Sequence, residues 1–291
     1  MKDPKEITHN SSKEERDYVL EYQNIDISHR DKLSVLGVEI DNISRDEAIA
    51  HILDFHKKKE TFHHILFLDP IRLMSMRPNK KLNRIAKKAS LVLAEGGGLS
   101  WASSQLGFEL KERISVISLM MDLIRYSEKK ELTLFFLGSK EDIIEKLFFN
   151  LIRHFPEIRI VGRHSGHLND ARELMVKEAI RKTNPDIIFI GMDFPRQEIW
   201  IENNTGYFGK SIVIGAWGNF DTLSGKIKKA PDYFQLRGLT WLWRIFTHPY
   251  RLDKVYNMFQ FFISVKLESW KMKRDAKLKA KENSPPPEEL S

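Results

Sequence analysis

Two acidic residues stand where predicted β-strands end. Glu95 follows the apolar run Leu91–Ala94 and precedes three glycines, and Asp69 follows the apolar run His64–Leu68. The carboxyl ends of parallel strands form the binding edge of an open α/β sheet, so we expect both carboxylates there. A carboxylate at this edge can deprotonate a hydroxyl as a general base, and Glu95 is our first candidate, the alternative being a surface or helix-capping acid. Asp69 would orient a hydroxyl or merely cap the next helix.

Glycine follows four of the predicted strands. It lets the backbone approach a phosphate or sugar closely, and the helix N-termini that come next favour anions. One such glycine would only mark a tight turn, but four of these turns, one a triple glycine beside a carboxylate, favour a nucleotide-type site. The dinucleotide fingerprint G-x-G-x-x-G is absent, which weighs against an NAD-binding protein. The glycines are Gly96 to Gly98, Gly138, Gly191 and Gly215, and our candidates for the nucleotide site are Gly96, Gly97, Gly138 and Gly191.

A polar segment follows the predicted strand Ile187–Ile190. Pro195 is expected at the first position of a helix. Arg196 and Gln197 would then lie beside the helix N-terminus, where they suit a base or a phosphate, and Glu198 comes next. An ordinary helix cap is the alternative, which the preceding strand and glycine make weaker.

More polar residues come after the last predicted strand. Asp221 and Lys229 are candidates for contacts with a sugar or a phosphate. Arg244, Arg251 and Lys254 form a basic trio that could pair with a diphosphate. A solvated charged face is the alternative for this trio.

The sequence indicates neither a metal site nor a cofactor. The histidines of His63-His64 and His164-Ser-Gly-His167 lack the accompanying acids of a metal centre. No D-x-D pair, P-loop or G-x-S-x-G pattern occurs, and the chain has no cysteine. We therefore predict a site that works without a metal ion or cofactor.

From Leu33 onward, short apolar runs alternate with amphipathic stretches of helical length. This alternation predicts a Rossmann-like α/β fold, with a mainly parallel sheet and helices on both faces. The expected strands are Leu33–Ile40, His64–Leu68, Leu91–Ala94, Leu132–Leu137, Ile158–Val161, Ile187–Ile190 and Ile212–Ile214. The expected helices are Arg45–Lys58, Asn79–Lys88, Ser100–Leu106, Leu119–Glu128, Lys140–His154, Asp170–Lys182 and Arg196–Asn203.

Charge is unevenly distributed along the chain. Of a net +7, residues 226–281 hold 14 Lys and Arg against 4 Asp and Glu, whereas the first 225 residues hold 33 of each sign. The basic segment also carries apolar residues at helical spacing, among them Phe259, Phe262 and Trp270. This pattern is typical of an amphipathic helix in a membrane interface, although packing on the chain's own domain or on a partner is the alternative.

We expect four segments. They are a disordered or loosely attached leader at 1–32, an α/β core at 33–225, a basic amphipathic helical appendage at 226–275 and a flexible tail at 276–291. No apolar run approaches the ~18 residues of a membrane span. The N-terminus lacks an apolar signal core, so we expect a cytoplasmic protein.

Taken in order, these residues resemble the WecG/TagA/CpsF family of bacterial glycosyltransferases. Gly191–Glu198 is similar to the family's G-x-P-x-Q-E segment. Gly218–Pro231 is similar to its G-x-x-F-D-x-x-x-G…R-A-P block, with Lys229 where arginine is usual. Gly238–Arg251 is similar to its G-L-E-W…R-L…P-x-R ending, and the resemblance runs from about Leu33 to Lys254.

The first half of the chain departs from the family pattern. The family's T-P-N-P reads Phe67-Leu68-Asp69-Pro70 here, and its A-D-G reads Ala94-Glu95-Gly96. Its R-V-x-G-x-D-L begins at Arg113 and lacks the glycine and the aspartate. The family is thought to hold catalytic and acceptor-binding groups in this half, which adds Arg113 to the candidate acceptor residues. We expect altered sugar specificity, with a non-catalytic sugar-nucleotide- or lipid-binding relative as the alternative.

The resemblance implies an inverting transfer of N-acetylmannosamine, or a related sugar, from UDP. The acceptor would be N-acetylglucosamine on undecaprenyl diphosphate, in the synthesis of a surface polysaccharide. Gly96, Gly97, Gly138, Gly191, Arg196, Gln197, Glu198 and Asp221 would bind the donor, and Arg113, Lys229, Arg244, Arg251 and Lys254 the acceptor and its diphosphate.

The resemblance also implies peripheral attachment, through the C-terminal appendage, to the inner face of the plasma membrane. The expected partners are a UDP-sugar, a polyprenyl-diphosphate-linked sugar and an anionic membrane surface. We expect no nucleic-acid partner, because the C-terminal aromatics follow a helical stripe instead of interleaving with phosphate contacts. A homo-oligomer is compatible with the sequence, which fixes neither the oligomeric state nor the sugar.

Overall fold

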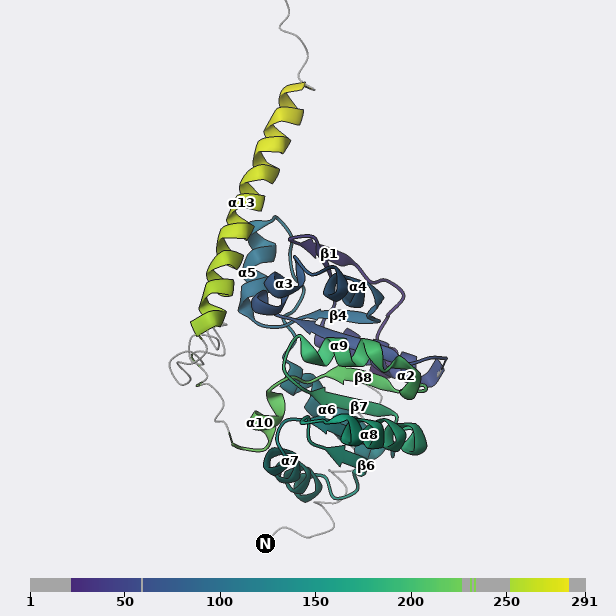
Figure 1. Cartoon of the computed structure of the whole chain (residues 1–291). Coiled ribbons are helices and arrows are strands. Elements are labelled where there is room, and N and C mark those ends of the chain that lie inside the picture. The colour runs from purple at the N-terminus through teal and green to yellow at the C-terminus, as the bar shows by residue number, and fades with distance from the viewer. Residues whose placement is uncertain (1–21, 59, 227–230, 232, 234–251, 283–291) are drawn as a thin grey trace, which may run out of the picture.

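The computed structural model describes residues 22–58, 60–226, 231, 233 and 252–282. Within these ranges the chain forms an α/β domain and a long C-terminal helix that lies against it (Figure 1).

A six-stranded parallel sheet forms the centre of the domain. Every pair of neighbouring strands is parallel, which confirms the predicted fold class. The four strands in the middle of the sheet are almost wholly buried because helices cover both faces, which is why they read as unbroken apolar runs. In spatial order the strands are β4 (Leu91–Ala94), β3 (His63–Leu68), β8 (Ile212–Gly215), β7 (Ile187–Gly191), β5 (Thr133–Gly138) and β6 (Arg159–His164).

Helices pack on the two faces of the sheet in separate apolar clusters. Alternate strand residues such as Phe67 and Phe189 face one cluster, and their neighbours Leu66 and Ile188 face the opposite side. The first face is covered by α2 (Arg45–Lys58), α6 (Val116–Lys129), α7 (Glu141–His154) and α10 (Asn219–Leu223). The second face is covered by α3 (Pro70–Met76), α4 (Lys80–Lys88), α5 (Gly97–Gln105), α8 (Asp170–Thr183) and α9 (Arg196–Asn203).

The expected strand Leu33–Ile40 is instead a hairpin. Strands β1 (Lys32–Val35) and β2 (Val38–Asp41) pair in antiparallel fashion across a two-residue turn. Leu36 and Gly37 both have positive φ, 52° and 83°, as this turn requires. The sequence prediction also missed two short helices, α3 and α10, both of which follow strands at the carboxyl edge of the sheet.

The segment before β1 contacts the core. Tyr22, in the 3-10 turn Tyr22–Asn24, is 4% exposed and belongs to the cluster on the first face of the sheet. Ile25 packs against the same cluster. The chain is therefore already packed on the domain at Tyr22, within the segment that we expected to be disordered or loosely attached.

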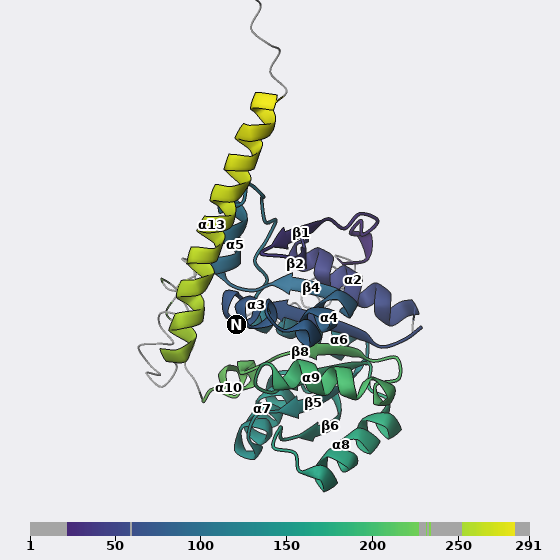
Figure 2. The ribbon, with the colours of Figure 1, turned by 45° about the horizontal axis from the view of Figure 1, so that its top comes forward.

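Helix α13 (Leu252–Glu282) lies along α3 and α5, and its C-terminal half extends beyond the domain (Figures 1 and 2). Phe261 and Val265 are fully buried against the domain. The hydroxyl of Ser269 donates a hydrogen bond to the carbonyl oxygen of Gln105 at 2.7 Å, and Lys266 Nζ donates to the side chain of Gln105 at 2.6 Å. The predicted C-terminal amphipathic helix is thus present, and one of its faces packs on its own domain.

The opposite face of α13 is apolar and exposed. Phe259 is 64% exposed and Trp270 60% exposed, on the side of the helix away from Phe261. Among the described side chains from Tyr256 to Trp270, the large exposed apolar residues are Tyr256, Phe259, Ile263, Leu267 and Trp270. In the described part of the chain, no helix has both the length and the apolar content needed to cross a membrane.

Candidate active site

The two candidate carboxylates lie side by side at the carboxyl edge, as the strand-end rule predicts. Strands β3 and β4 are neighbours, and the backbone N–H of Glu95 donates to the carbonyl oxygen of Leu68 at 2.7 Å. The side chains of Asp69 and Glu95 are 18% and 24% exposed, so both still reach solvent. The two acids come from consecutive strands of one parallel sheet, whose register brings their ends together.

A buried arginine lies between these two acids. Arg72 Nη1 is 3.3 Å from Glu95 Oε2, and Arg72 Nε is 3.7 Å from Asp69 Oδ2. The same Nη1 donates to the carbonyl oxygen of Phe67 at 2.9 Å. The Arg72 side chain is only 4% exposed, so these ion pairs are screened far less than pairs on the surface.

The position of Arg72 follows from the start of α3. Asp69 is the N-cap, its carboxylate accepts the backbone N–H of Arg72 at 2.8 Å, and Pro70 occupies the first helical position. The first turn of the helix therefore carries Arg72 back over the end of β3. Asp69 therefore caps the helix, which is one of the two roles expected from the sequence, and also pairs with the guanidinium of Arg72.

The ring of Trp217 stacks on the Arg72 guanidinium. Its ring centroid is 4.2 Å from Arg72 Cζ, a cation–π contact between the β8–α10 loop and α3. Trp217 has a φ of 30°, an uncommon backbone conformation for a residue with a side chain. The loop is held by hydrogen bonds from the backbone N–H of Trp217 to Gln197 Oε1 at 3.1 Å and to the carbonyl oxygen of Ile190 at 3.3 Å.

Glycines allow the carboxyl ends of β5 and β7 to lie in close contact. A Cβ at Gly138, whose φ is 149°, would collide with the carbonyl group of Gly191, so only glycine fits there. Ser139, the next residue, donates its backbone N–H to the carbonyl oxygen of Gly191 at 2.8 Å. Its hydroxyl donates to Asp221 Oδ1 at 3.0 Å. Asp221 therefore lies at the edge beside the two glycines.

Gly96 and Gly97 begin the helix that follows Glu95. Gly96 is the N-cap of α5 with a φ of 82°, and Gly97 is the first helical residue. A Cβ on Gly96 would meet no atom within 4 Å, so its conformation and not a neighbouring atom requires glycine. Gly98 packs against the ring of Pro70, which joins the starts of α3 and α5.

Gln197 and Glu198 are buried and do not project from the edge. They are 3% and 2% exposed, and Gln197 Nε2 donates to Glu198 Oε1 at 2.8 Å. Glu198 Oε2 lies 3.1 Å from His64 Nε2 of β3, another buried group. In this structure the pair fixes α9 and the Trp217 loop against the sheet.

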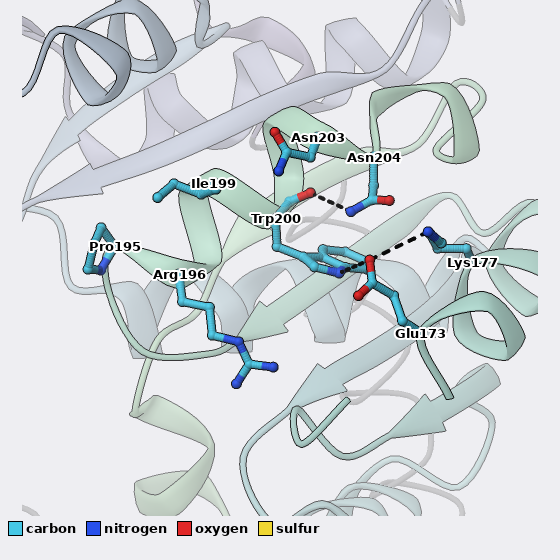
Figure 3. A pocket seen from close by; sticks show the side chains of 8 residues that line it. All are labelled: Glu173, Lys177, Pro195, Arg196, Ile199, Trp200, Asn203 and Asn204. Carbon is cyan, nitrogen blue, oxygen red and sulfur yellow. Dashed lines mark hydrogen bonds and ion pairs between the residues drawn. The ribbon is translucent and has the colours of Figure 1, made fainter. Parts of the chain in front are cut away.

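Arg196 faces a different region from the carboxylates. The helix α9 has the expected bounds, and Pro195 is its N-cap instead of its first helical residue. Arg196 lines a groove of about 610 Å³ between α8 and α9 (Figure 3). The groove also contains Trp200, whose Nε1 donates to Glu173 Oε1 at 3.2 Å.

Of the predicted acceptor residues, only Arg113 has a described side chain. It is half-buried, and the backbone N–H of the next residue, Ile114, donates to the carbonyl oxygen of Ala94 at 2.8 Å, which places this segment beside Glu95. Lys229, Arg244 and Arg251 lie outside the described residues, as does the side chain of Lys254.

The histidines noted in the sequence have other partners. The His63 ring stacks on Phe55 with centroids 4.2 Å apart, and burial lowers its pKa below the ordinary value. Nδ1 of His164 is 2.9 Å from the carbonyl oxygen of Ser165. Within the part of the chain that the structure describes, no three His, Asp or Glu side chains gather in a metal-binding arrangement.

The model of the glycosyl transferase WecG/TagA/CpsF family matches residues 33–275. The chain belongs to this family. It is accordingly a glycosyltransferase, and the match extends beyond the α/β core into α13.

Proteins similar to the chain include three bacterial enzymes, each named N-acetylglucosaminyldiphosphoundecaprenol N-acetyl-β-D-mannosaminyltransferase. The protein of Bacillus spizizenii is 29% identical over 187 residues, which cover 64% of this chain and 72% of the relative. That of Bacillus subtilis is 29% identical over 181 residues, 62% of this chain and 70% of the relative. That of Staphylococcus aureus is 28% identical over 218 residues, 75% of this chain and 85% of the relative.

Four of the departures from the WecG/TagA/CpsF pattern fall at two kinds of position. Phe67 and Val116, where the pattern has threonine and glycine, are buried in the apolar core and cannot contact a ligand. Asp69 and Glu95, where it has asparagine and aspartate, remain partly exposed and both pair with Arg72. The altered acids therefore form one connected cluster in this member of the family.

Sequence reasoning missed Arg72, Trp217 and Ser139. The dipeptide Asp69-Pro70 was a usable signal for Arg72, since an N-cap followed by proline marks a helix start and places the third residue of that helix beside the cap. Nothing local in the sequence indicates that Trp217 reaches α3.

Proposed function

We propose that the chain transfers an N-acetylmannosamine-type sugar from a UDP-sugar to N-acetylglucosamine linked to undecaprenyl diphosphate. The support is its membership of the WecG/TagA/CpsF family together with relatives that bear this activity in their names. The structural observation that carries the proposal is the pair Glu95 and Asp69 at the carboxyl edge of the sheet. Acceptors of this kind serve in the synthesis of surface polysaccharides.

Glu95 is the proposed general base. It takes the proton from the attacking hydroxyl of the acceptor sugar as that oxygen bonds to the anomeric carbon of the donor. The bond from the anomeric carbon to the UDP oxygen breaks at the same time, and its electron pair leaves with UDP. Attack from the face opposite the leaving group inverts the anomeric carbon.

The donor is proposed to bind over the ends of β5, β7 and β8. The helices after β3 and β7 cover one face of the sheet and those after β5 and β8 cover the other, so the connections diverge here. Such a switch point opens a crevice at the carboxyl edge. Gly138, Gly191 and Asp221 line this edge beside Ser139 and supply close backbone approach and a carboxylate.

Donor binding is proposed to need no divalent ion. The reason is that the sequence lacks a D-x-D pair, which could hold such an ion. Calorimetry with UDP in excess chelator should give the same affinity as calorimetry with magnesium. Binding that vanishes in chelator and returns with magnesium would show that the donor site has been assigned wrongly.

The exposed face of α13 is proposed to contact an anionic membrane surface. Beyond the apolar residues from Tyr256 to Trp270, the helix presents exposed basic residues that suit anionic headgroups. They are Lys271, Lys273, Arg274 and Lys277. The full chain should sediment with phosphatidylglycerol-containing vesicles and less so in high salt, whereas equal sedimentation with neutral vesicles would contradict the electrostatic part.

Two substitutions test the base. Glu95→Gln removes the carboxylate but keeps its size, and should lower turnover by about 10²–10⁴-fold. Glu109→Gln, at an exposed site after the end of α5, is the matched control. Unchanged turnover in Glu95→Gln would remove Glu95 from the mechanism and leave Asp69 to be tested.

Glu95→Asp shortens the side chain to the family's length. A slower Glu95→Asp variant would show that the site has adapted around glutamate. If the unmodified chain is inert with every UDP-sugar tried and Glu95→Asp gains activity, the chain is a decayed enzyme.

A further inference from the structure

We propose that Arg72 is a positioning residue that holds the Glu95 carboxylate in place and keeps it ionised for the transfer reaction. The inference rests on the proposed role of Glu95 as general base. Arg72 does not itself contact the reacting atoms in this proposal.

The first support is the geometry of the guanidinium. Nη1 bonds the carbonyl oxygen of Phe67 at 2.9 Å and pairs with Glu95 Oε2 at 3.3 Å. The carbonyl group belongs to β3, a rigid strand at the middle of the sheet, so the arginine fixes Glu95 relative to that strand. Because the Glu95 side chain is still 24% exposed, this fixed carboxylate can accept a proton from a bound hydroxyl.

The second support is the balance of charge. Glu95 and Asp69 both pair with the same buried cation, Arg72, and Arg113 lies in the segment beside them. Nearby carboxylates disfavour each other's ionised form, whereas a cation within 4 Å favours it. The family's asparagine at position 69 would bring no second negative charge. Asp69 and Arg72 are therefore expected to act as a coupled pair in this chain.

The third support is the way the structure holds Arg72. Trp217 stacks on the guanidinium at 4.2 Å, and Gln197 accepts the backbone N–H of Trp217 at 3.1 Å. Gln197 is in turn bonded to Glu198, which faces His64 in the sheet. A chain of contacts thus connects the family's P-x-Q-E segment to Glu95 through Trp217 and Arg72. Gln197 and Glu198 can therefore act by supporting Arg72, without contacting the donor.

The test uses the full chain and the substitution Arg72→Met, which keeps an unbranched apolar stem and removes the charged guanidinium. We expect kcat to fall by about 10–100-fold, since displacement of a catalytic group by ~1 Å costs a factor of that size. The donor KM should stay within about threefold of the unmodified value. The acid limb of the pH–rate profile should move to higher pH, because Glu95 loses its cation. Asp69→Asn in the Arg72→Met background should move this limb back.

Three comparisons keep the result interpretable. Arg77→Met, an exposed change at the end of the same helix, should leave kcat and the pH profile unchanged. Arg72→Lys keeps the charge but not the planar fork, so it should lower kcat without moving the acid limb. Circular dichroism would show whether Arg72→Met folds. If it does not, Arg72→Lys still tests whether Arg72 positions Glu95, and Asp69→Asn still tests the effect of charge on Glu95.

Two outcomes overturn the proposal. One is a folded Arg72→Met variant with unmodified kcat and pH profile, and the other is a raised donor KM with unchanged kcat, which would make Arg72 a donor-binding residue. If Glu95→Gln is fully active, the general-base assignment fails instead. Carbon-13 NMR titration of the Glu95 carboxylate then tests the effect of Arg72 independently of catalytic activity. If Arg72 keeps Glu95 ionised, Arg72→Met must still move the titration of Glu95 to higher pH.

Discussion

Replacing Phe261 by alanine should detach α13 from the domain. The Phe261 side chain is fully buried, and its ring lies 6.4 Å from that of Trp101 on α5 and 5.9 Å from that of Phe262. Met258 and Val265 are buried on the same face of the helix. Burial of three such side chains supplies about 5–9 kcal/mol of gross docking energy.

Truncating a buried phenylalanine costs about 3–5 kcal/mol. The substitution therefore removes roughly half of the gross docking energy and leaves little to hold the helix. Hydrogen exchange followed by mass spectrometry should show this as a loss of amide protection over residues 258–269. The expected loss is about 10²–10³-fold, since each 1.4 kcal/mol corresponds to a factor of ten.

Phe259→Ala is the matched control, two residues away on the exposed face of the same helix. It should change the free energy of unfolding by no more than about 0.5 kcal/mol. Phe259→Ala should instead weaken binding of the chain to anionic vesicles. Phe261→Ala should affect this binding only because α13 detaches from the domain. Equal loss of amide protection in the two variants would refute the assignment of the two helix faces.

Two further predictions concern stability. The free energy of unfolding should fall as the pH drops below about 6.5, the ordinary pKa of histidine. Burial, with a smaller effect of nearby Arg30, lowers the pKa of His51, so the unfolded chain binds more protons than the folded one over this range. Urea titrations at pH 7.5 and 5.5 should show a smaller difference for His51→Gln, and an identical difference would count against this cause. Gly191→Ala should lower stability by about 1–3 kcal/mol, because its Cβ would lie 2.8 Å from the ring of Phe220. Gly206→Ala, which meets no atom within 4 Å, is the control in thermal melts, and equal melting temperatures would contradict the clash.

The strands could be predicted because most of them are buried on both faces and therefore apolar at every position. The edge strand β6 is only partly buried, and the expected strand Leu33–Ile40 shows the limit of this rule. Its apolar residues continue through the turn at Leu36 and Gly37, and only the glycine indicated that the chain reverses there. Helix α13 was predicted from its spacing, but it is apolar on two opposite faces, so the sequence could not tell which face meets the domain.

The location of Glu95 and Asp69 followed from their place at strand ends, a rule that needs only the chain order. Arg72 could not be placed in the same way, because its position depends on α3, a seven-residue helix with too few residues to show a period. The burial of Gln197 and Glu198 was also not predictable. Glu198 faces His64, which is far away in the sequence, and two polar residues give no local sign that they will meet inside the protein.

Strand β8 lies between β3 and β7, although it is the last strand of the sheet to be synthesised. Until it emerges from the ribosome, β3–β4 and β7–β5–β6 are separate sheet fragments with unpaired inner edges. Unpaired strand edges are templates for aggregation, so the nascent chain is exposed to that hazard through most of its translation. Trp217 comes two residues after the end of β8, so the contact that covers Arg72 cannot form before the sheet itself is closed.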